Sequence, residues 1–154
     1  MLTCIDCGRN KKSQRGLRCG PCGAVLPTHV VPRGAELRPS AVRIMTAEQA
    51  AWMGALIEGE GSIVLSTEKR ASTPYQRPTL SVVNTSAEII SACLRFTGVG
   101  TVVGRQAYPH YKWAWFWKVS ATHDLLTLLP QVIPALGDKK LKAFAAIEIL
   151  TRRL

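Results

Sequence analysis

The stretch that decides the fold covers residues 52–63 and reads WMGALIEGEGSI. A capping box begins at Thr46, so we expect a helix to start there and to run to about Ile57. Glu58 and Glu60 then lie at the C-terminal end of this helix, where the negative end of the helix dipole disfavours carboxylates. Such a break of a local rule points to a functional site, and a bound divalent cation would remove the conflict.

Small residues occupy one face of the same predicted helix. Alanine or glycine stands at positions 50, 51, 54 and 55, and residues four apart are neighbours on a helix surface. Because small side chains let two helix backbones approach closely, we expect Ala51, Gly54 and Ala55 to contact a second copy of the chain. The alternative is ordinary packing of this face within one chain.

The residues that follow predict two strands, a helix, two more strands and a final helix, in an α+β chain. Alternating patterns place the strands over residues 62–70, 79–84, 101–108 and 111–120. Pro74 and Pro78 are expected to break the loop between the first two strands. A capping box at Thr85 is expected to open the middle helix, which Gly98 ends.

Three further expectations concern the core. The middle helix should bury its apolar residues Ile89, Ile90, Cys93, Leu94 and Phe96. In the fourth strand, the two-residue period of a β-strand directs one face toward the helices, namely Trp113, Trp115, Trp117 and Val119. After residue 122 we expect helical sequence that is interrupted by Pro130 and Pro134, and a final helix from about Lys139.

The composition favours an anionic partner. The 154 residues include 20 Lys and Arg against 10 Asp and Glu, a formal net charge of +10, which suits nucleic acid or an acidic membrane surface. No apolar run approaches the ~20 residues that span a bilayer, and the N-terminus lacks the apolar segment of a signal peptide. We therefore expect a cytoplasmic protein that is not bound to a membrane and whose cysteines are reduced.

Four cysteines near the N-terminus have the spacing of a metal site. They form two C-x-x-C pairs, each followed by glycine, and are Cys4, Cys7, Cys19 and Cys22. Four thiolates in this arrangement predict a tetrahedral structural zinc ion, whereas a redox dithiol would be a single pair in a βαβ context. His29 is an alternative ligand. The stretch from Pro27 to Ser40 is rich in proline, glycine and charge, so we place a zinc module with its linker at residues 1–40 and the main domain at 41–154.

Basic residues lie between the two cysteine pairs, namely Arg9, Lys11, Lys12, Arg15 and Arg18. This cluster suits contact with phosphates. The alternative is a solvated loop that counterbalances the thiolate charge.

Residues 53–61 resemble the nine-residue LAGLIDADG motif of homing endonucleases. Two departures are that Gly54-Ala55 replaces Ala-Gly and that both acids are Glu instead of Asp. The resemblance extends over about residues 46 to 154 through further family-like positions, which are Asn84-Thr85, Thr97-Gly98-Val99-Gly100, the tryptophan-rich strand ending in Lys118, and Lys139-Lys140.

The resemblance implies an αββαββα fold with a saddle-shaped antiparallel sheet that lies in the DNA major groove. It implies a site-specific, double-strand DNA endonuclease that depends on Mg²⁺, with Glu60 as the catalytic, metal-binding acid and the carbonyl of Gly59 as a further oxygen ligand. Glu58 would help to close the helix end. Lys118 falls where the family places a basic active-site residue; the alternative is a phosphate-contacting or solvated lysine. Asn84 and Ser86 lie near polar active-site positions.

The single motif per chain implies a symmetric homodimer on a pseudo-palindromic site. Both strands are cut across the minor groove, which is only ~6 Å wide, so the two acids must lie close together. Alternation along the strands gives the expected DNA contacts, which are Val64, Ser66, Glu68, Arg70, Arg77, Thr79, Ser81, Arg105 and Lys112. Arg105 is the strongest candidate for base reading, since arginine pairs bidentately with guanine. For each, the alternative is an ordinary surface residue.

Two other functions remain open at this point. Some relatives of this fold bind nucleic acid without cutting it, as RNA-splicing maturases or transcription factors, although the presence of Glu60 argues against that. A zinc-stabilised interaction protein unrelated to nucleic acid would leave the acidic helix end unexplained.

Overall fold

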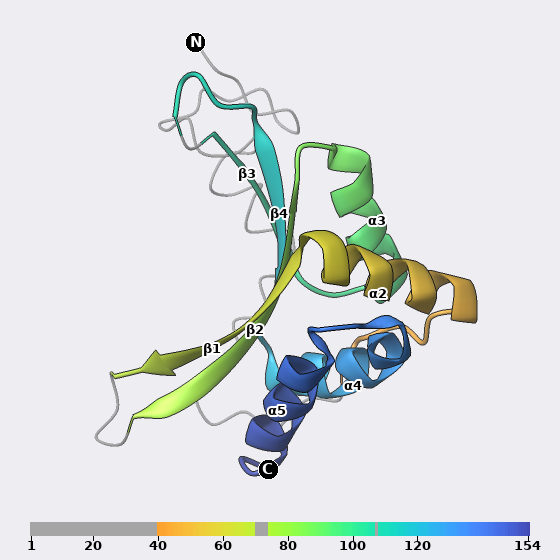
Figure 1. Ribbon diagram of the computed structural model, residues 1–154, viewed down its shortest axis with the longest axis vertical. Helices are drawn as coiled ribbons and strands as arrows, with labels where there is room; N and C mark the ends of the chain where they lie inside the picture. The colour runs from red at the N-terminus through yellow and green to blue at the C-terminus, as the bar shows by residue number, and fades with distance from the viewer. Residues whose placement is uncertain (1–39, 70–73, 107) are drawn as a thin grey trace. The chain divides into compact units, whose positions relative to one another are not determined.

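The computed structural model describes residues 40–69, 74–106 and 108–154. The predicted zinc site lies outside the described residues, with its four cysteines, the basic residues between them and His29. Arg70 also lies outside them, and the predicted domain boundary between residues 40 and 41 lies at their edge. In chain order the elements are α2 (Ala47–Glu60), β1 (Gly61–Glu68), β2 (Tyr75–Asn84), α3 (Ala87–Thr97), β3 (Thr101–Arg105), β4 (Ala114–Val119), α4 (Thr122–Val132), the 3-10 turn η1 (Ile133–Ala135) and α5 (Lys140–Thr151) (Figure 1). The expected α+β order is confirmed, with α4 and η1 preceding the final helix.

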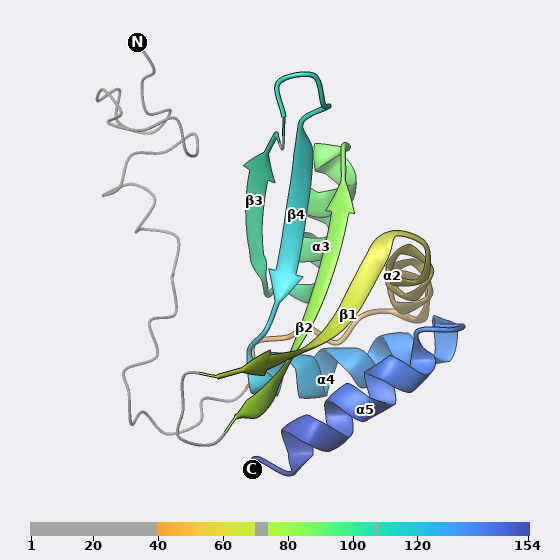
Figure 2. The ribbon, with the colours of Figure 1, turned by 60° about the vertical axis from the view of Figure 1, so that its left-hand side comes forward.

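The four strands form one antiparallel sheet in the order β1-β2-β4-β3. The helices cover one side of this sheet and leave the other side open (Figures 1 and 2). In Figure 1 the β1–β2 half bends away from the β3–β4 half, so that the open side is concave, as the expected saddle shape requires. We call this uncovered side the open face.

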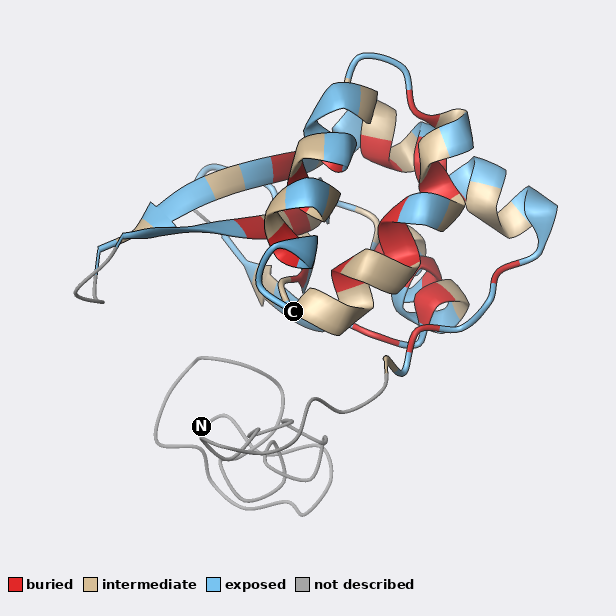
Figure 3. Cartoon of the chain, turned by 90° about the horizontal axis from the view of Figure 1, so that it is seen from below, coloured by how far each residue is buried: buried red, intermediate tan, exposed pale blue. Residues whose placement is uncertain are grey.

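The core lies between the covered side of the sheet and the helices, where the buried positions concentrate (Figure 3). Trp117 of β4 is fully buried, and its indole N–H donates to the carbonyl of Val99 at 2.9 Å. A Cβ at Gly100 would lie 2.4 Å from that indole nitrogen, so the close approach of this loop requires glycine. Cys93 is also a core residue, and burial raises the pKa of its thiol to about 12.

The capping box at the start of α2 is confirmed, since Thr46 and Gln49 each accept a hydrogen bond from the backbone N–H of the other. The helix runs three residues beyond the expected end, to Glu60, and β1 follows without a loop. Gly61 makes this junction possible: its N–H bonds the carbonyl of Ile57, and a Cβ at Gly61 would lie 2.7 Å from the Ile57 backbone.

The expected role of Pro78 as a loop breaker is wrong. Pro78 lies inside β2, where it pairs with Leu65 of β1. Pairing of β2 with β4 begins only at Leu80, so Pro78 needs no N–H bond on the β4 side. Pro130 also fails to end a helix, because α4 continues to Val132 and then tightens into η1, which contains Pro134.

Two expectations about α3 and β4 need correction. The residue that caps α3 is Ser86 and not Thr85; its hydroxyl accepts from the N–H of Ile89 at 3.4 Å. Leu94 is exposed, and the small residues Ala92 and Thr97 are buried in addition to the expected Ile90 and Cys93. On β4, Trp117 and Val119 face the core as expected, whereas Trp113 precedes the strand and is about half exposed.

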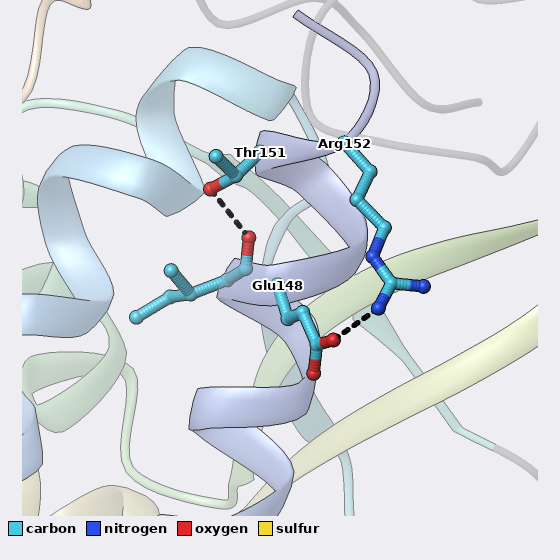
Figure 4. Close-up of polar contacts among 4 residues, drawn as sticks. Glu148, Thr151 and Arg152 are labelled. Atoms are coloured by element: carbon cyan, nitrogen blue, oxygen red, sulfur yellow. Dashed lines mark hydrogen bonds and ion pairs between the residues drawn. The ribbon is translucent and has the colours of Figure 1, made fainter.

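Two local contacts stabilise the last turn of α5. Thr151 donates its hydroxyl proton to the carbonyl of Ile147 at 2.8 Å, and Arg152 pairs with Glu148 one turn earlier (Figure 4). Both interactions are exposed, so they add little to stability beyond ordering the last turn.

Candidate functional site

The junction of α2 and β1 presents a carboxylate at the surface. Glu60 is the last residue of α2 and is exposed. Its carboxylate accepts a hydrogen bond from the side-chain amide of Asn84, the last residue of β2. Asn84 is fixed in turn, because its carbonyl oxygen accepts the N–H of Ser86 at 2.7 Å. The ends of α2 and β2 therefore hold Glu60 in one orientation while leaving it accessible.

Glu58, by contrast, is used within the chain. Its carboxylate accepts from the backbone N–H groups of Gly137, Asp138 and Lys139 at 3.0, 3.1 and 3.3 Å. Desolvation raises the pKa of Glu58, but these three hydrogen bonds and the nearby charge of Lys139 outweigh it, so the pKa of this carboxyl lies below its usual value. The Glu58 side chain thus links the end of α2 to the segment that precedes α5.

Lys139 resolves the helix-dipole conflict at the end of α2. Its ammonium group donates to the carbonyl of Ile57 at 2.9 Å and to that of Glu58. The helix has no basic residue of its own in the last turn, so Lys139 supplies the positive charge that such a terminus favours. The conflict seen in the sequence is thus met partly by a side chain from the start of α5, and within the described residues Glu60 forms no ion pair.

Lys139 is a site residue that the sequence analysis did not select. Its ammonium group contacts the residue two before Glu60, whereas the predicted Lys118 lies on β4, exposed on the open face between Ser81 and Thr101. Among the described residues no hydrogen bond or ion pair joins Lys118 to Glu60. The absence of a basic residue in the last turn of α2, together with the pair Lys139-Lys140, was the signal that could have indicated it.

The open face carries most of the predicted DNA contacts. Register and burial place Val64, Ser66, Glu68, Arg77, Thr79, Ser81, Lys118 and Arg105 on it. Lys112 is exposed in the segment before β4. Arg77 lies 4.0 Å from Glu68, while the guanidinium of Arg105 lies 4.1 Å from the ring centre of Phe116. The described residues of the open face are therefore mainly basic, and the acidic residue Glu68 lies next to Arg77.

The small-residue face of α2 divides into two parts. Gly54 is buried: a Cβ there would lie 2.5 Å from the Cβ of Ala135 and 2.9 Å from the carbonyl oxygen of Val132. The expectation that Gly54 contacts a second chain is therefore wrong, because η1 and the end of α4 occupy its surface. Ala51, Ala55 and Gly59 are exposed at four-residue spacing, and a Cβ at Gly59 would meet nothing within 4 Å.

The described residues contain neither a ready-made metal cluster nor a membrane-spanning helix. No group of three or more His, Cys, Asp or Glu side chains in residues 40–69, 74–106 and 108–154 could hold a metal ion together. In the same ranges no helix has both the length and the apolar character needed to cross a membrane.

Comparison with known proteins assigns the fold. No protein-family profile and no curated protein match the sequence. Among solved structures, the homing endonuclease I-CvuI in complex with its target matches with a TM-score of 0.59 and 21% identity, over 69% of this chain and 68% of that one. The archaeal intron-encoded homing endonuclease I-Vdi141I complexed with DNA matches with a TM-score of 0.57 and 18% identity, over 68% and 67%.

Longer proteins match in part. The group I intron-encoded homing endonuclease I-CeuI complexed with DNA matches with a TM-score of 0.58 and 15% identity, over 71% of this chain and 56% of that one. The LAGLIDADG homing endonuclease I-SmaMI bound to cleaved DNA matches with a TM-score of 0.55 and 14% identity, over 66% of this chain and only 35% of that one. The described part of this chain thus has the fold of LAGLIDADG homing endonucleases.

Proposed function

We propose that the protein is a site-specific DNA endonuclease that hydrolyses both strands of its target as a homodimer and requires a divalent metal ion. One observation carries the proposal. The exposed carboxylate of Glu60 is held by Asn84 at the end of α2, beside the concave, basic open face of the sheet, which no helix of the described residues covers. The solved structures of the same fold support it, because those proteins are homing endonucleases and several were crystallised with DNA.

The open face supplies the binding surface. A two-stranded β-ribbon fits the major groove of B-DNA, and basic side chains on it neutralise phosphates and release counterions. Arg77, Arg105, Lys112 and Lys118 are exposed on or beside this face. Thr79 and Ser81 lie between them on β2 and offer hydroxyl groups that pair with either donors or acceptors of base edges.

The residues near Glu60 fit a magnesium site that is completed by other molecules. Each chain offers the Glu60 carboxylate and the backbone carbonyl of Gly59, both oxygen donors of the kind that Mg²⁺ prefers. Mg²⁺ is commonly bound through one or two carboxylates, with waters and substrate phosphate filling the other positions, so the small donor set is sufficient. When bound, the ion would polarise the scissile phosphate and lower the pKa of a water molecule.

The chain's own residues divide the remaining work. Asn84 donates to Glu60 and so keeps the carboxylate directed to the surface. Lys139 brings a positive charge to within two residues of Glu60, where negative charge develops on a phosphate that is attacked. Lys118 lies farther along the open face and serves to hold a neighbouring phosphate. The net reaction adds water across one phosphorus–oxygen ester bond in each strand.

A homodimer is required because each chain provides one such acid. Ala51, Ala55 and Gly59 form the interface in this proposal, since their exposed stripe lets two α2 helices approach closely and so brings the two Glu60 side chains near the minor groove. Glycine within a helix costs ~1 kcal/mol relative to alanine, and among the described residues none lies close enough to Gly59 to exclude a Cβ. Close approach by a second molecule gives a reason for glycine at this position.

The four N-terminal cysteines complete the proposal. We assign one structural Zn²⁺ to Cys4, Cys7, Cys19 and Cys22, because their spacing suits a closed tetrahedral site. The basic residues between the two pairs would add phosphate contacts to those of the sheet.

The test is incubation of the purified full chain with DNA from its own genetic neighbourhood, with Mg²⁺ and with EDTA. The proposal expects one double-strand cut that needs the metal ion. Binding without any cut in Mg²⁺ would favour a non-cleaving nucleic-acid-binding protein of the same fold.

A further inference from the structure

Three apolar side chains form a row across the open face. Val83 of β2 pairs with Phe116 of β4, and Phe116 pairs with Val103 of β3. Val83 and Val103 are 37% and 56% exposed, although valine at such positions costs solvation that Thr or Ser would avoid. The next row along the same face is polar and consists of Ser62, Ser81, Lys118 and Thr101. The apolar row is thus a continuous stripe across β2, β4 and β3 and lies next to a polar, basic row, while Val64 is a further exposed apolar residue on the same face.

Arg105 borders this stripe. It lies two residues after Val103 on the same face, and its guanidinium packs over the ring of Phe116 at 4.1 Å. The cation–π contact holds the planar fork of donors beside the apolar row before any ligand arrives. The guanidinium therefore lies over the middle member of the row, while Val83 and Val103 on either side of Phe116 stay exposed.

DNA is the partner that this combination fits. Thymine presents a C5-methyl group in the major groove, and guanine presents two acceptors that arginine bonds bidentately. A protein partner would more commonly meet an apolar centre with a polar rim, whereas here the stripe is flanked by Lys118 and Arg105 and so matches a polyanion.

We propose that Val83, Phe116 and Val103 read thymine methyl groups in each half-site, and that Arg105 reads an adjacent guanine. This inference rests on the proposed DNA binding and adds the base identity that the site selects. Val83 directly precedes Asn84, whose side chain bonds the Glu60 carboxylate. The row therefore lies at the end of β2 that is next to the proposed active site. The thymines are therefore expected on the side of the half-site nearest the cut.

The experiment begins with a selection of bound sequences from a random DNA library, using the full-length Glu60→Gln protein with Ca²⁺. The inference expects half-sites with at least two fixed A·T pairs next to a fixed G·C pair. Replacing those thymines by uracil removes only the methyl groups. Affinity should fall about fourfold for each methyl that the row contacts, since burying one such group contributes ~0.8 kcal/mol.

A matched pair of variants locates the contact. Val103→Thr keeps the β-branched shape but replaces a methyl by a hydroxyl on the open face, and Val102→Thr makes the same change on the opposite face of β3. Val103→Thr should weaken the preference for thymine over uracil at one position, because threonine keeps only one of the two methyl groups, and Val102→Thr should retain the full preference. Val83→Thr should act like Val103→Thr at a different position.

The outcomes separate this inference from the function on which it rests. Equal affinity of the parent protein for thymine and uracil targets, with sequence-specific binding intact, would overturn the reading of methyl groups and leave the endonuclease proposal standing. Loss of the preference in Val102→Thr but not in Val103→Thr would overturn it as well. A selection that yields no enriched sequence would contradict the proposed site-specific binding itself.

Discussion

Two glycines of α2 should respond in opposite ways to the same substitution. Gly54→Ala adds a methyl group that would lie 2.5 Å from the Cβ of Ala135 and 2.9 Å from the carbonyl oxygen of Val132. Neither atom is the end of a flexible side chain, so the helix or the turn must shift, at a cost of ~2–3 kcal/mol, the upper part of the usual range for overpacking. Alanine regains ~1 kcal/mol of helix propensity. We expect a net loss of about 1–2 kcal/mol, or a fall in Tm of about 2–8 °C.

Gly59→Ala should leave the isolated chain intact or raise its stability by up to ~1 kcal/mol, because its Cβ would meet nothing within 4 Å. In the proposed dimer, however, two methyl groups would be forced between the helices, and the dissociation constant should rise by about thirtyfold for ~2 kcal/mol of overpacking.

The assay is thermal unfolding at several protein concentrations, with sedimentation to measure assembly. Gly54→Ala should lower Tm by the same amount at every concentration, whereas Gly59→Ala should show its loss only where the parent protein is dimeric. A Gly54→Ala protein as stable as the parent would refute the packing of Gly54 against η1. Unchanged assembly of Gly59→Ala would refute the placement of the interface.

Three further predictions concern other parts of the chain. The pKa of Glu58 is lowered in the folded protein, so the ionised carboxylate stabilises the fold above about pH 4.5, and this stabilisation is lost as the pH falls through the folded-state pKa. The difference in Tm between the parent protein and Glu58→Gln should therefore narrow between about pH 6 and pH 3. A difference that stays constant with pH would count against the three backbone hydrogen bonds of Glu58. Trp117→Phe removes the indole donor from the buried carbonyl of Val99, which then keeps only the Thr97 hydroxyl at 3.1 Å. The free energy of unfolding should fall by ~1–3 kcal/mol in urea titration, and a loss under ~0.5 kcal/mol would mean that the indole bond is not formed. Metal analysis of the full chain should find about one zinc, which Cys4→Ser with Cys7→Ser removes, and zinc retained by that double variant would exclude the predicted ligands.

Local patterns predicted the order of elements because each depends on neighbours in sequence. The capping box at Thr46 and the alternation along β1 and β4 need only local geometry, and both were confirmed. The predicted ends of helices and strands were less accurate where contacts with residues distant in sequence determine where an element ends. Lys139 caps carbonyls of Ile57 and Glu58, and this contact across more than 80 residues lengthens α2 in a way that no local pattern records.

The errors at the candidate site have the same origin. The spacing of small residues identified one face of α2, but Gly54 and Ala55 are adjacent, and only the position of Ala135 determines which of them is covered by the same chain. Pro78 was assigned to a loop because its tolerance in β2 depends on where β4 begins to pair. The sequence pattern alone draws attention to Glu60 at the end of α2, whereas its hydrogen bond to Asn84 depends on the fold bringing together residues 24 apart.

The most direct test of the central claim is the Glu60→Gln substitution in a cleavage assay with Mg²⁺, alongside a gel-shift assay with Ca²⁺. The amide keeps the shape and the contact with Asn84 but removes the charge that would hold the metal ion. The account predicts loss of nicking and of double-strand cleavage, while DNA binding stays tight and salt-sensitive because phosphate contacts supply most of it. Lys118→Ala should slow cleavage by much less. A Glu60→Gln protein that cuts its target at the parent rate would contradict the account and mean that the active site lies elsewhere.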